Sequence, residues 1–288
     1  MGRRRAGARP VSRSGLESWK ARAPRPFVVL TLILASLWLP IACKKTPTDS
    51  LTSTRIHSLA KTAKPSGHSG AKLAIILDDL GSNRHAAEEI FDLPYPLTIS
   101  VLPNHAHSVE IAQEAERRGY QVLLHLPMQA VATEKPEAQE LRVGMAAADV
   151  SKLLNQFLEN VPGAVGVNNH QGSEATSDPN LMRELMPVLR DYRLFYIDSR
   201  TTSATIAYET AQSSRVPSAF RNVPFLDDVE EVSAVRKQLE LALRGAREKG
   251  EALAIGHPHH ATLQALREVL PSSESEGVRL AFASELVH

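Results

Sequence analysis

The stretch Leu73-Ala-Ile-Ile-Leu-Asp-Asp-Leu-Gly81 decides the fold class, because five apolar residues in a row are followed at once by two carboxylates. The apolar part does not alternate with polar residues, which is typical of a strand buried on both faces of a parallel sheet. Similar runs recur at residues 97–102, 121–124, 164–167, 194–197 and 252–255, with a weaker one at 216–220. The sequence therefore predicts about seven mostly parallel strands.

Apolar residues with helical spacing separate these runs, most clearly at residues 108–118, 147–158, 179–190 and 229–249. Strands that alternate with helices over residues 72–288 predict a single α/β domain. Since six or seven such units are more than an open sheet needs, we expect the sheet to close, or nearly close, into a barrel.

Polar side chains follow five of the seven apolar runs. In a parallel sheet or barrel, reacting groups collect beyond the carboxyl ends of the strands. Each residue alone has an ordinary structural interpretation, such as a turn, a helix cap or a hydrogen-bonded core histidine, but their shared position favours one common site. The residues are Asp78 and Asp79 after the first run, His125 after the third, Asn168, Asn169 and His170 after the fourth, Asp198 and Arg200 after the fifth, and His257 after the last.

These residue types suit metal-assisted hydrolysis. Two histidines and a carboxylate with an open coordination position form a site for a first-row divalent metal, and histidine ligands favour zinc. Such a metal polarises a carbonyl group and lowers the pKa of bound water. A second carboxylate can take the proton of the water, and a further histidine can protonate the leaving group. The set therefore indicates hydrolysis of an amide or an ester.

The charge distribution argues against a nucleic-acid partner. The chain of 288 residues holds 33 Lys and Arg against 32 Asp and Glu, yet residues 72–288 hold 20 basic and 30 acidic residues, a net charge of −10. An acidic domain is a poor partner for nucleic acid, whose binding depends on neutralising phosphates. The single cysteine excludes an internal disulfide framework and a zinc site with several cysteines.

Residues 1–43 predict export from the cytoplasm. Eight basic residues within positions 1–25 precede an apolar run at 26–42, which is the layout of an export signal. Cys43 follows this run and resembles the lipidated cysteine of a bacterial lipoprotein signal, although Pro40 stands where such signals prefer leucine. An uncleaved membrane anchor and an ordinary cleaved signal are the alternatives. All three place the domain outside the cytoplasm, in the cell envelope, and the polar residues 44–71 predict a flexible tether to it.

Five short blocks, in this order along the chain, resemble the divergent polysaccharide deacetylase family, a branch of the carbohydrate deacetylase superfamily. The blocks are Ile75–Gly81, Leu123–Met128, Gly166–Ser173, Tyr196–Thr201 and Ala254–Pro258. The resemblance covers about residues 72–287 and implies an irregular (β/α) barrel. It also implies a carbohydrate substrate and a divalent metal.

The resemblance assigns roles to the residues that match the superfamily's motifs. It makes Asp78 the catalytic base and Asp79 a metal ligand, because the superfamily carries such an Asp-Asp pair. His125 matches the first histidine ligand, and His257 matches by position the histidine that assists the leaving group.

The chain departs from the ordinary pattern at the second histidine ligand. Ordinary members have it four residues after the first, where this chain has Gln129. His170 is the natural candidate for the missing ligand. Asn169, Asp198 and Arg200 are candidates for substrate binding.

The function that we expect from these observations is a metal-dependent hydrolase that removes acetyl groups from an envelope or extracellular carbohydrate. A catalytically silent, lipid-anchored module that binds a glycan or an envelope protein with the same pocket is the alternative. A third possibility is a glycoside hydrolase that uses Asp78 and Asp198, but this reaction leaves the histidines without a role.

Overall fold

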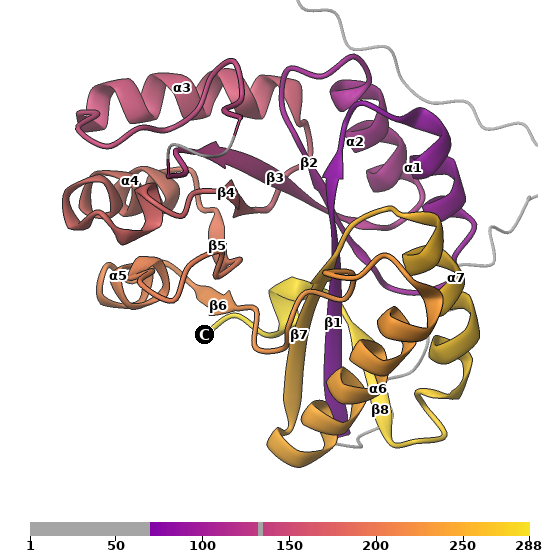
Figure 1. Cartoon of the computed structure of the whole chain (residues 1–288). Coiled ribbons are helices and arrows are strands. Elements are labelled where there is room, and N and C mark those ends of the chain that lie inside the picture. Colours follow the sequence, from indigo (N-terminus) through magenta and orange to yellow (C-terminus); the bar gives the residue numbers. More distant parts are fainter. Residues whose placement is uncertain (1–69, 132–134) are drawn as a thin grey trace, which may run out of the picture. The chain divides into compact units, whose positions relative to one another are not determined.

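The computed structural model describes residues 70–131 and 135–288, so the predictions for residues 1–69, including Cys43, lie outside the described residues. The described part contains eight strands: β1 (Ala71–Leu80), β2 (Thr98–Val101), β3 (Gln121–Met128), β4 (Gly166–Gln171), β5 (Phe195–Asp198), β6 (Ser218–Phe220), β7 (Glu251–Gly256) and β8 (Val278–Ala281). They form one sheet in the order β6-β5-β4-β3-β2-β1-β7, with β8 beside β1 (Figure 1). Every strand pairing in this sheet is parallel.

The sheet curls into an incomplete barrel. One edge of β1 pairs with β7, and the other edge pairs first with β8, over Ala71–Ala74, and then with β2. Strand β6 does not pair with β7. Two separate backbone hydrogen bonds from the segment after β6 bridge the gap instead: Asn222 N donates to Leu253 O (3.2 Å), and Leu226 N donates to Ile255 O (2.9 Å). The predicted irregular barrel of parallel strands is confirmed, and β8 is an additional strand that the sequence analysis missed.

Alternation along the strands divides the apolar residues between two cores. Ala74 and Ile76 of β1 face the barrel interior, where they pack with Leu123, Phe195, Ile197, Leu253 and Ile255. Leu73, Ile75 and Leu77 face outward and pack in the core that includes the helices. Because both faces are buried, these strands need no polar alternation, which is why they appear as continuous apolar runs in the sequence.

Seven α-helices connect the strands in the described residues, and the larger core packs between them and the outer face of the sheet (Figure 1). They are α1 (Arg84–Phe91), α2 (Ser108–Arg117), α3 (Ala147–Asn160), α4 (Pro179–Asp191), α5 (Ala207–Ser213), α6 (Val232–Lys249) and α7 (His260–Val269). The four predicted helices correspond to α2, α3, α4 and α6. In the described parts of the chain, no helix is both long enough and apolar enough to cross a bilayer.

The strands that carry polar residues are longer than their apolar runs. β1, β3 and β4 continue through Asp79, His125 and His170. The expectation that these residues follow the strands is therefore corrected: they lie within the strands. His125 and His170 pair with residues of the neighbouring strand, whereas Asp79 lies where the pairing of β1 with β2 shifts. Residues placed on strands in this way are held more firmly than residues on loops.

Candidate active site

A cavity of about 290 Å³ opens at the carboxyl ends of the strands, where the interior-facing residues change from apolar to polar. Successive residues alternate between the two faces of a strand, so a residue two positions after an interior residue also faces the interior. This alternation places polar residues at the cavity: Asp78 follows Ile76, His125 follows Leu123, Ser199 follows Ile197, and His257 follows Ile255.

Asp79 breaks the alternation and joins the same cavity as Asp78. Its φ of +58° lies in the left-handed region, where Asp and Asn are the commonest residues after glycine. The pairing of β1 with β2 shifts here, because Leu77 pairs with Ile99 whereas Leu80 pairs with Val101. One extra residue on β1 is a β-bulge, and bulges redirect side chains in this way.

Three potential metal ligands converge on one point. Asp79 Oδ1 lies 3.1 Å from His125 Nε2 and 2.9 Å from His170 Nδ1, and the two nitrogens are 3.2 Å apart. Ligand atoms about 2.0–2.1 Å from one metal ion are roughly 2.9–3.4 Å apart in octahedral or tetrahedral geometry. Among the described residues, the buried Asp79 Oδ1 has no hydrogen-bond partner. These donors therefore fit a divalent metal.

The electrostatics of Asp79 agree with this arrangement. Burial opposes its ionisation, but the adjoining imidazoles of His125 and His170 outweigh burial and lower the pKa of the carboxyl below its ordinary value. Asp79 is consequently an anion across the physiological range, as a carboxylate ligand must be.

Asn168 connects the metal-ligand group to Asp78. His125 Nδ1 lies 3.0 Å from Asn168 Oδ1, and Asn168 Nδ2 donates to Asp78 Oδ1 at 2.9 Å and to Oδ2 at 3.1 Å. Because the amide oxygen only accepts, His125 donates from Nδ1. Its Nε2, which faces Asp79 and His170, is then the atom that would bind a metal. One amide thus orients a candidate ligand and a buried carboxylate together.

Asp78 is buried beside the metal-ligand group. Burial raises the pKa of its carboxyl above the ordinary value, although the charges of His125 and His257 partly oppose this effect. A carboxylate with a raised pKa holds a proton closer to neutral pH, which suits a general base.

His257 directly follows β7 and faces the triad of potential metal ligands, Asp79, His125 and His170. It is paired with Asp227. His257 Nδ1 lies 3.0 Å from Asp227 Oδ1, and Nε2 lies 3.9 Å from Asp79 Oδ2. Burial opposes protonation of His257, but the hydrogen bond with Asp227 and the charges of Asp78, Asp227 and Asp79 raise its pKa to about 9. The imidazole is therefore protonated at neutral pH and can donate a proton into the cavity.

The three predicted substrate-binding residues occupy different surroundings. Asn169 lines the cavity, but its side chain is bonded to Tyr196 OH, Ser199 N and Gln171 O. Asp198 is buried outside the lining and accepts from Arg200 N and Thr205 Oγ1, at 2.8 and 2.9 Å. The Arg200 guanidinium stacks 3.5 Å above the Phe220 ring. Contact of these three residues with substrate stays a prediction.

Gln129, which replaces the ordinary histidine ligand, lies away from the triad. Its side chain donates to Glu174 Oε2 (2.8 Å) and accepts from Val143 N (2.9 Å), so it links two loops. The structure instead brings His170 to the triad, at the place where the sequence analysis looked for the missing ligand.

The sequence analysis gave no role to Asn168, Ser199 or Asp227. Alternation of faces could have indicated the first two: Ser199 stands two positions after the interior-facing Ile197, and Asn168 stands next to Val167, which faces outward. Asp227 lies in the loop before α6, where no periodic pattern assigns a direction to the side chain.

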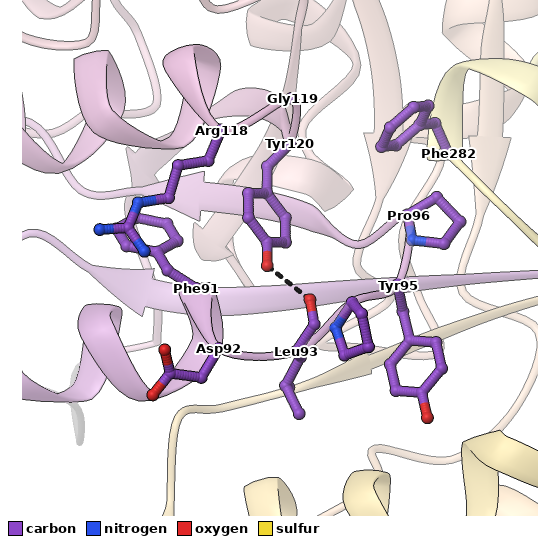
Figure 2. Close-up of a pocket in the computed structure, with 10 residues that line it drawn as sticks. Phe91, Asp92, Leu93, Tyr95, Pro96, Arg118, Gly119, Tyr120 and Phe282 are labelled. Carbon is purple, nitrogen blue, oxygen red and sulfur yellow. Dashed lines mark hydrogen bonds between the residues drawn. The ribbon is translucent and has the colours of Figure 1, made fainter. Parts of the chain in front are cut away.

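A larger cavity of about 490 Å³ lies at the opposite ends of the strands, before β2 and β3 begin (Figure 2). Its walls include the rings of Phe91, Tyr95, Tyr120 and Phe282, and the Tyr120 hydroxyl donates to Leu93 O (2.6 Å). Asp92 is the single carboxylate in its lining, which contains no histidine. This cavity therefore offers neither a set of metal ligands nor an acid–base pair.

The curled barrel of parallel strands and the polar groups at its carboxyl edge are those expected of the divergent polysaccharide deacetylase family. The chain belongs to the divergent polysaccharide deacetylase family, whose model matches residues 75–287. It is 36% identical over 217 residues to the uncharacterized protein YibQ of Escherichia coli (strain K12). This match covers 75% of this chain and 67% of YibQ.

Two solved structures show the same fold. The uncharacterized protein ATU2773 from Agrobacterium tumefaciens C58 has a TM-score of 0.71 and 20% identity, and the match covers 77% of this chain and 91% of that one. BA3943, a CE4 family pseudoenzyme from Bacillus anthracis, has a TM-score of 0.50 and 9% identity, with 76% and 66% covered. The predicted family and fold are confirmed.

Proposed function

We propose that the protein is a metal-dependent hydrolase that removes acetyl groups from a carbohydrate of the cell envelope or its surroundings. One observation carries this proposal: three ligand atoms lie within 3.2 Å of one another, beside the buried Asp78 and opposite the protonated His257. Family membership supports a carbohydrate substrate.

Asp79, His125 and His170 are the residues that would hold the metal. A divalent metal bound there supplies Lewis acidity that polarises the acyl carbonyl. Zinc suits two imidazoles and one carboxylate, and the set leaves room for a further ligand, as in catalytic sites.

Asp78 is placed to accept the proton of the attacking water. Its carboxylate is fixed by the amide of Asn168, and its raised pKa suits proton transfer near neutral pH. Because Asp78 is buried and Asn168 fixes its direction, the base needs no rearrangement before reaction.

His257 is placed to protonate the leaving group. Its Nδ1 is engaged by Asp227, so the proton that it can give is on Nε2, the nitrogen that faces Asp79 across the cavity. A pKa of about 9 keeps this proton in place at neutral pH until a more basic amine or alkoxide develops.

The remaining lining of the cavity suits a sugar. Ser199 and Thr201 contribute hydroxyl groups, and Gln171 carries a buried amide oxygen without a hydrogen-bond partner. Such groups bind sugar hydroxyls by hydrogen bonds. Phe225 adds an apolar ring that packs against His257, with centroids 5.8 Å apart.

The experiment that tests the proposal compares wild type with Asp78→Asn on an acetylated amino-sugar oligomer. The substitution is nearly isosteric and removes only the proton acceptor, so acetate release should fall by roughly 10²–10⁴-fold while the metal content is kept. Asp79→Asn should lose metal instead. If the wild type binds the oligomer but releases no acetate, the binding-module alternative replaces this proposal. Cleaved chains with retained acetate would favour the glycoside hydrolase.

A further inference from the structure

A second group of metal-ligand side chains borders the same cavity, whose lining includes Asp227 and His257 but not His259. Asp227, His257 and His259 each offer one ligand atom, and these atoms lie within 4.8 Å of one another. The group does not share a residue with the Asp79, His125 and His170 triad. We propose that Asp227, His257 and His259 bind a second divalent cation, more weakly than the triad, and that this cation inhibits the enzyme.

Two facing loops create this group. Residues 227–231 read Asp-Asp-Val-Glu-Glu, and residues 257–260 read His-Pro-His-His. They pair twice: His257 Nδ1 lies 3.0 Å from Asp227 Oδ1, and His259 Nε2 lies 3.5 Å from Glu230 Oε1. An acidic loop opposite a histidine loop attracts cations and supplies both ligand types that zinc prefers.

The other contacts of Asp227 orient its carboxylate for binding a cation. Its Oδ2 accepts from His257 N (2.6 Å) and from Thr262 Oγ1 (2.7 Å), which fixes the carboxylate. Its Oδ1 is bonded only to the His257 ring. A cation that binds Oδ1 and Nδ1 takes the place of the ring proton, which leaves to solvent as His257 becomes neutral.

The second site is accessible and its third ligand is free to adjust. The side chain of His259 is 40% exposed, and that of His257 is 28% exposed. The two rings are 5.7 Å apart at an interplanar angle of 46°, so a rotation of His259 closes the group around an ion. Because a strong Asp227–His257 hydrogen bond must first be given up, this site is weaker than the triad.

Occupation of the second site makes His257 a much weaker proton donor. A cation on Nδ1 and Oδ1 replaces the Nδ1 proton, so Nε2 keeps its proton on a neutral imidazole, which gives it up far less readily than an imidazolium does. This consequence for activity rests on the proposed function, whereas the binding itself does not. Excess metal should therefore inhibit, after the first equivalent has activated.

The test counts bound zinc on the full chain in detergent, after removal of metal with a chelator, by equilibrium dialysis at rising free Zn²⁺. The His259→Ala variant should bind one equivalent less than wild type, and His170→Ala should lose a different, tighter equivalent. His260→Ala is the matched control, because His260 is the exposed neighbour outside the group and should bind as wild type does. His259 is the N-cap of α7, so His259→Asn repeats the test with a residue that caps helices well.

Acetate release gives a second readout. At the Zn²⁺ concentration that fills the second site, wild-type activity should fall by roughly 10²-fold or more, the scale of a lost positioned acid, while His259→Asn resists this inhibition. Equal zinc counts for wild type and both His259 variants would overturn the proposal, whether or not the wild type releases acetate. A lost equivalent without any acetate release would support the site and refute the proposed function.

Discussion

Three residues determine whether the site can perform acid–base chemistry: Asp78, His257 and Asp227. Burial raises the pKa of Asp78 towards neutral pH, while Asp227 helps to hold that of His257 at about 9. A reaction that needs both a base and an acid needs one group that accepts a proton near neutral pH and another that keeps its proton there.

The His257 pKa depends on Asp227, and Asp227→Asn should reveal this in metal-free protein. Removing the charged partner leaves burial opposed only by the charges of Asp78 and Asp79, so the pKa of His257 should fall from about 9 towards the ordinary 6.5. Titration of the imidazole by NMR measures it. Thr262→Val is a useful comparison, because it removes one donor to Asp227 without removing the charge. An unchanged pKa in Asp227→Asn would contradict the assignment.

The same pair makes stability depend on pH. A histidine whose pKa is raised on folding stabilises the native state fully below its unfolded pKa of 6.5, and this contribution is lost as pH rises through about 9. Asp227 has a lowered pKa, so its contribution is present above the unfolded value and is lost in acid. The gap in melting temperature between wild type and Asp227→Asn should therefore be wide at pH 6 and narrow at pH 10. A gap that widens with pH would contradict the pairing.

At the scale of the elements, β4 has to pass close to β5 while carrying Asn168 and His170. Gly166 makes this possible, because a Cβ there would lie 2.5 Å from the Phe195 ring in the barrel interior. Gly166→Ala should lower the free energy of unfolding by about 1–3 kcal/mol through overpacking. Gly245→Ala is the matched control, since nothing lies within 4 Å of its Cβ in α6, and it should stabilise by about 0.5–1 kcal/mol. Urea unfolding of both variants measures this, and equal stability would contradict the packing.

The sequence predicts the strands that carry the site because both faces of β1, β3, β4, β5 and β7 are buried, which leaves continuous apolar runs. It could not predict β8, which is four residues long and contains an exposed arginine. Alternation from Ile76 explains Asp78, but it places Asp79 on the wrong face. The left-handed backbone at Asp79 comes from the tertiary register of β1 and β2, which no local pattern encodes.

At the scale of the whole molecule, the N-terminal segment bears on where the protein acts. We propose that it acts in the cell envelope, because a basic segment and an apolar run precede Cys43. If Cys43 is lipidated, Cys43→Ser should release the protein from membranes or block its processing. Membrane fractionation and intact mass measure this. Unchanged mass and unchanged membrane association would favour the uncleaved anchor.

The metal content of purified protein tests the central claim most directly, because the fold, the bulge at Asp79 and the departure at Gln129 all lead to the same three ligands. After dialysis against metal-free buffer, the wild type should retain about one equivalent of tightly bound divalent metal, and Asp79→Ala, His125→Ala and His170→Ala should each fall well below it, since two remaining ligands hold a divalent ion poorly. His85→Ala, at a side chain that is 84% exposed, should match the wild type. A wild type without metal, or a His170→Ala variant that keeps a full equivalent, would contradict the account.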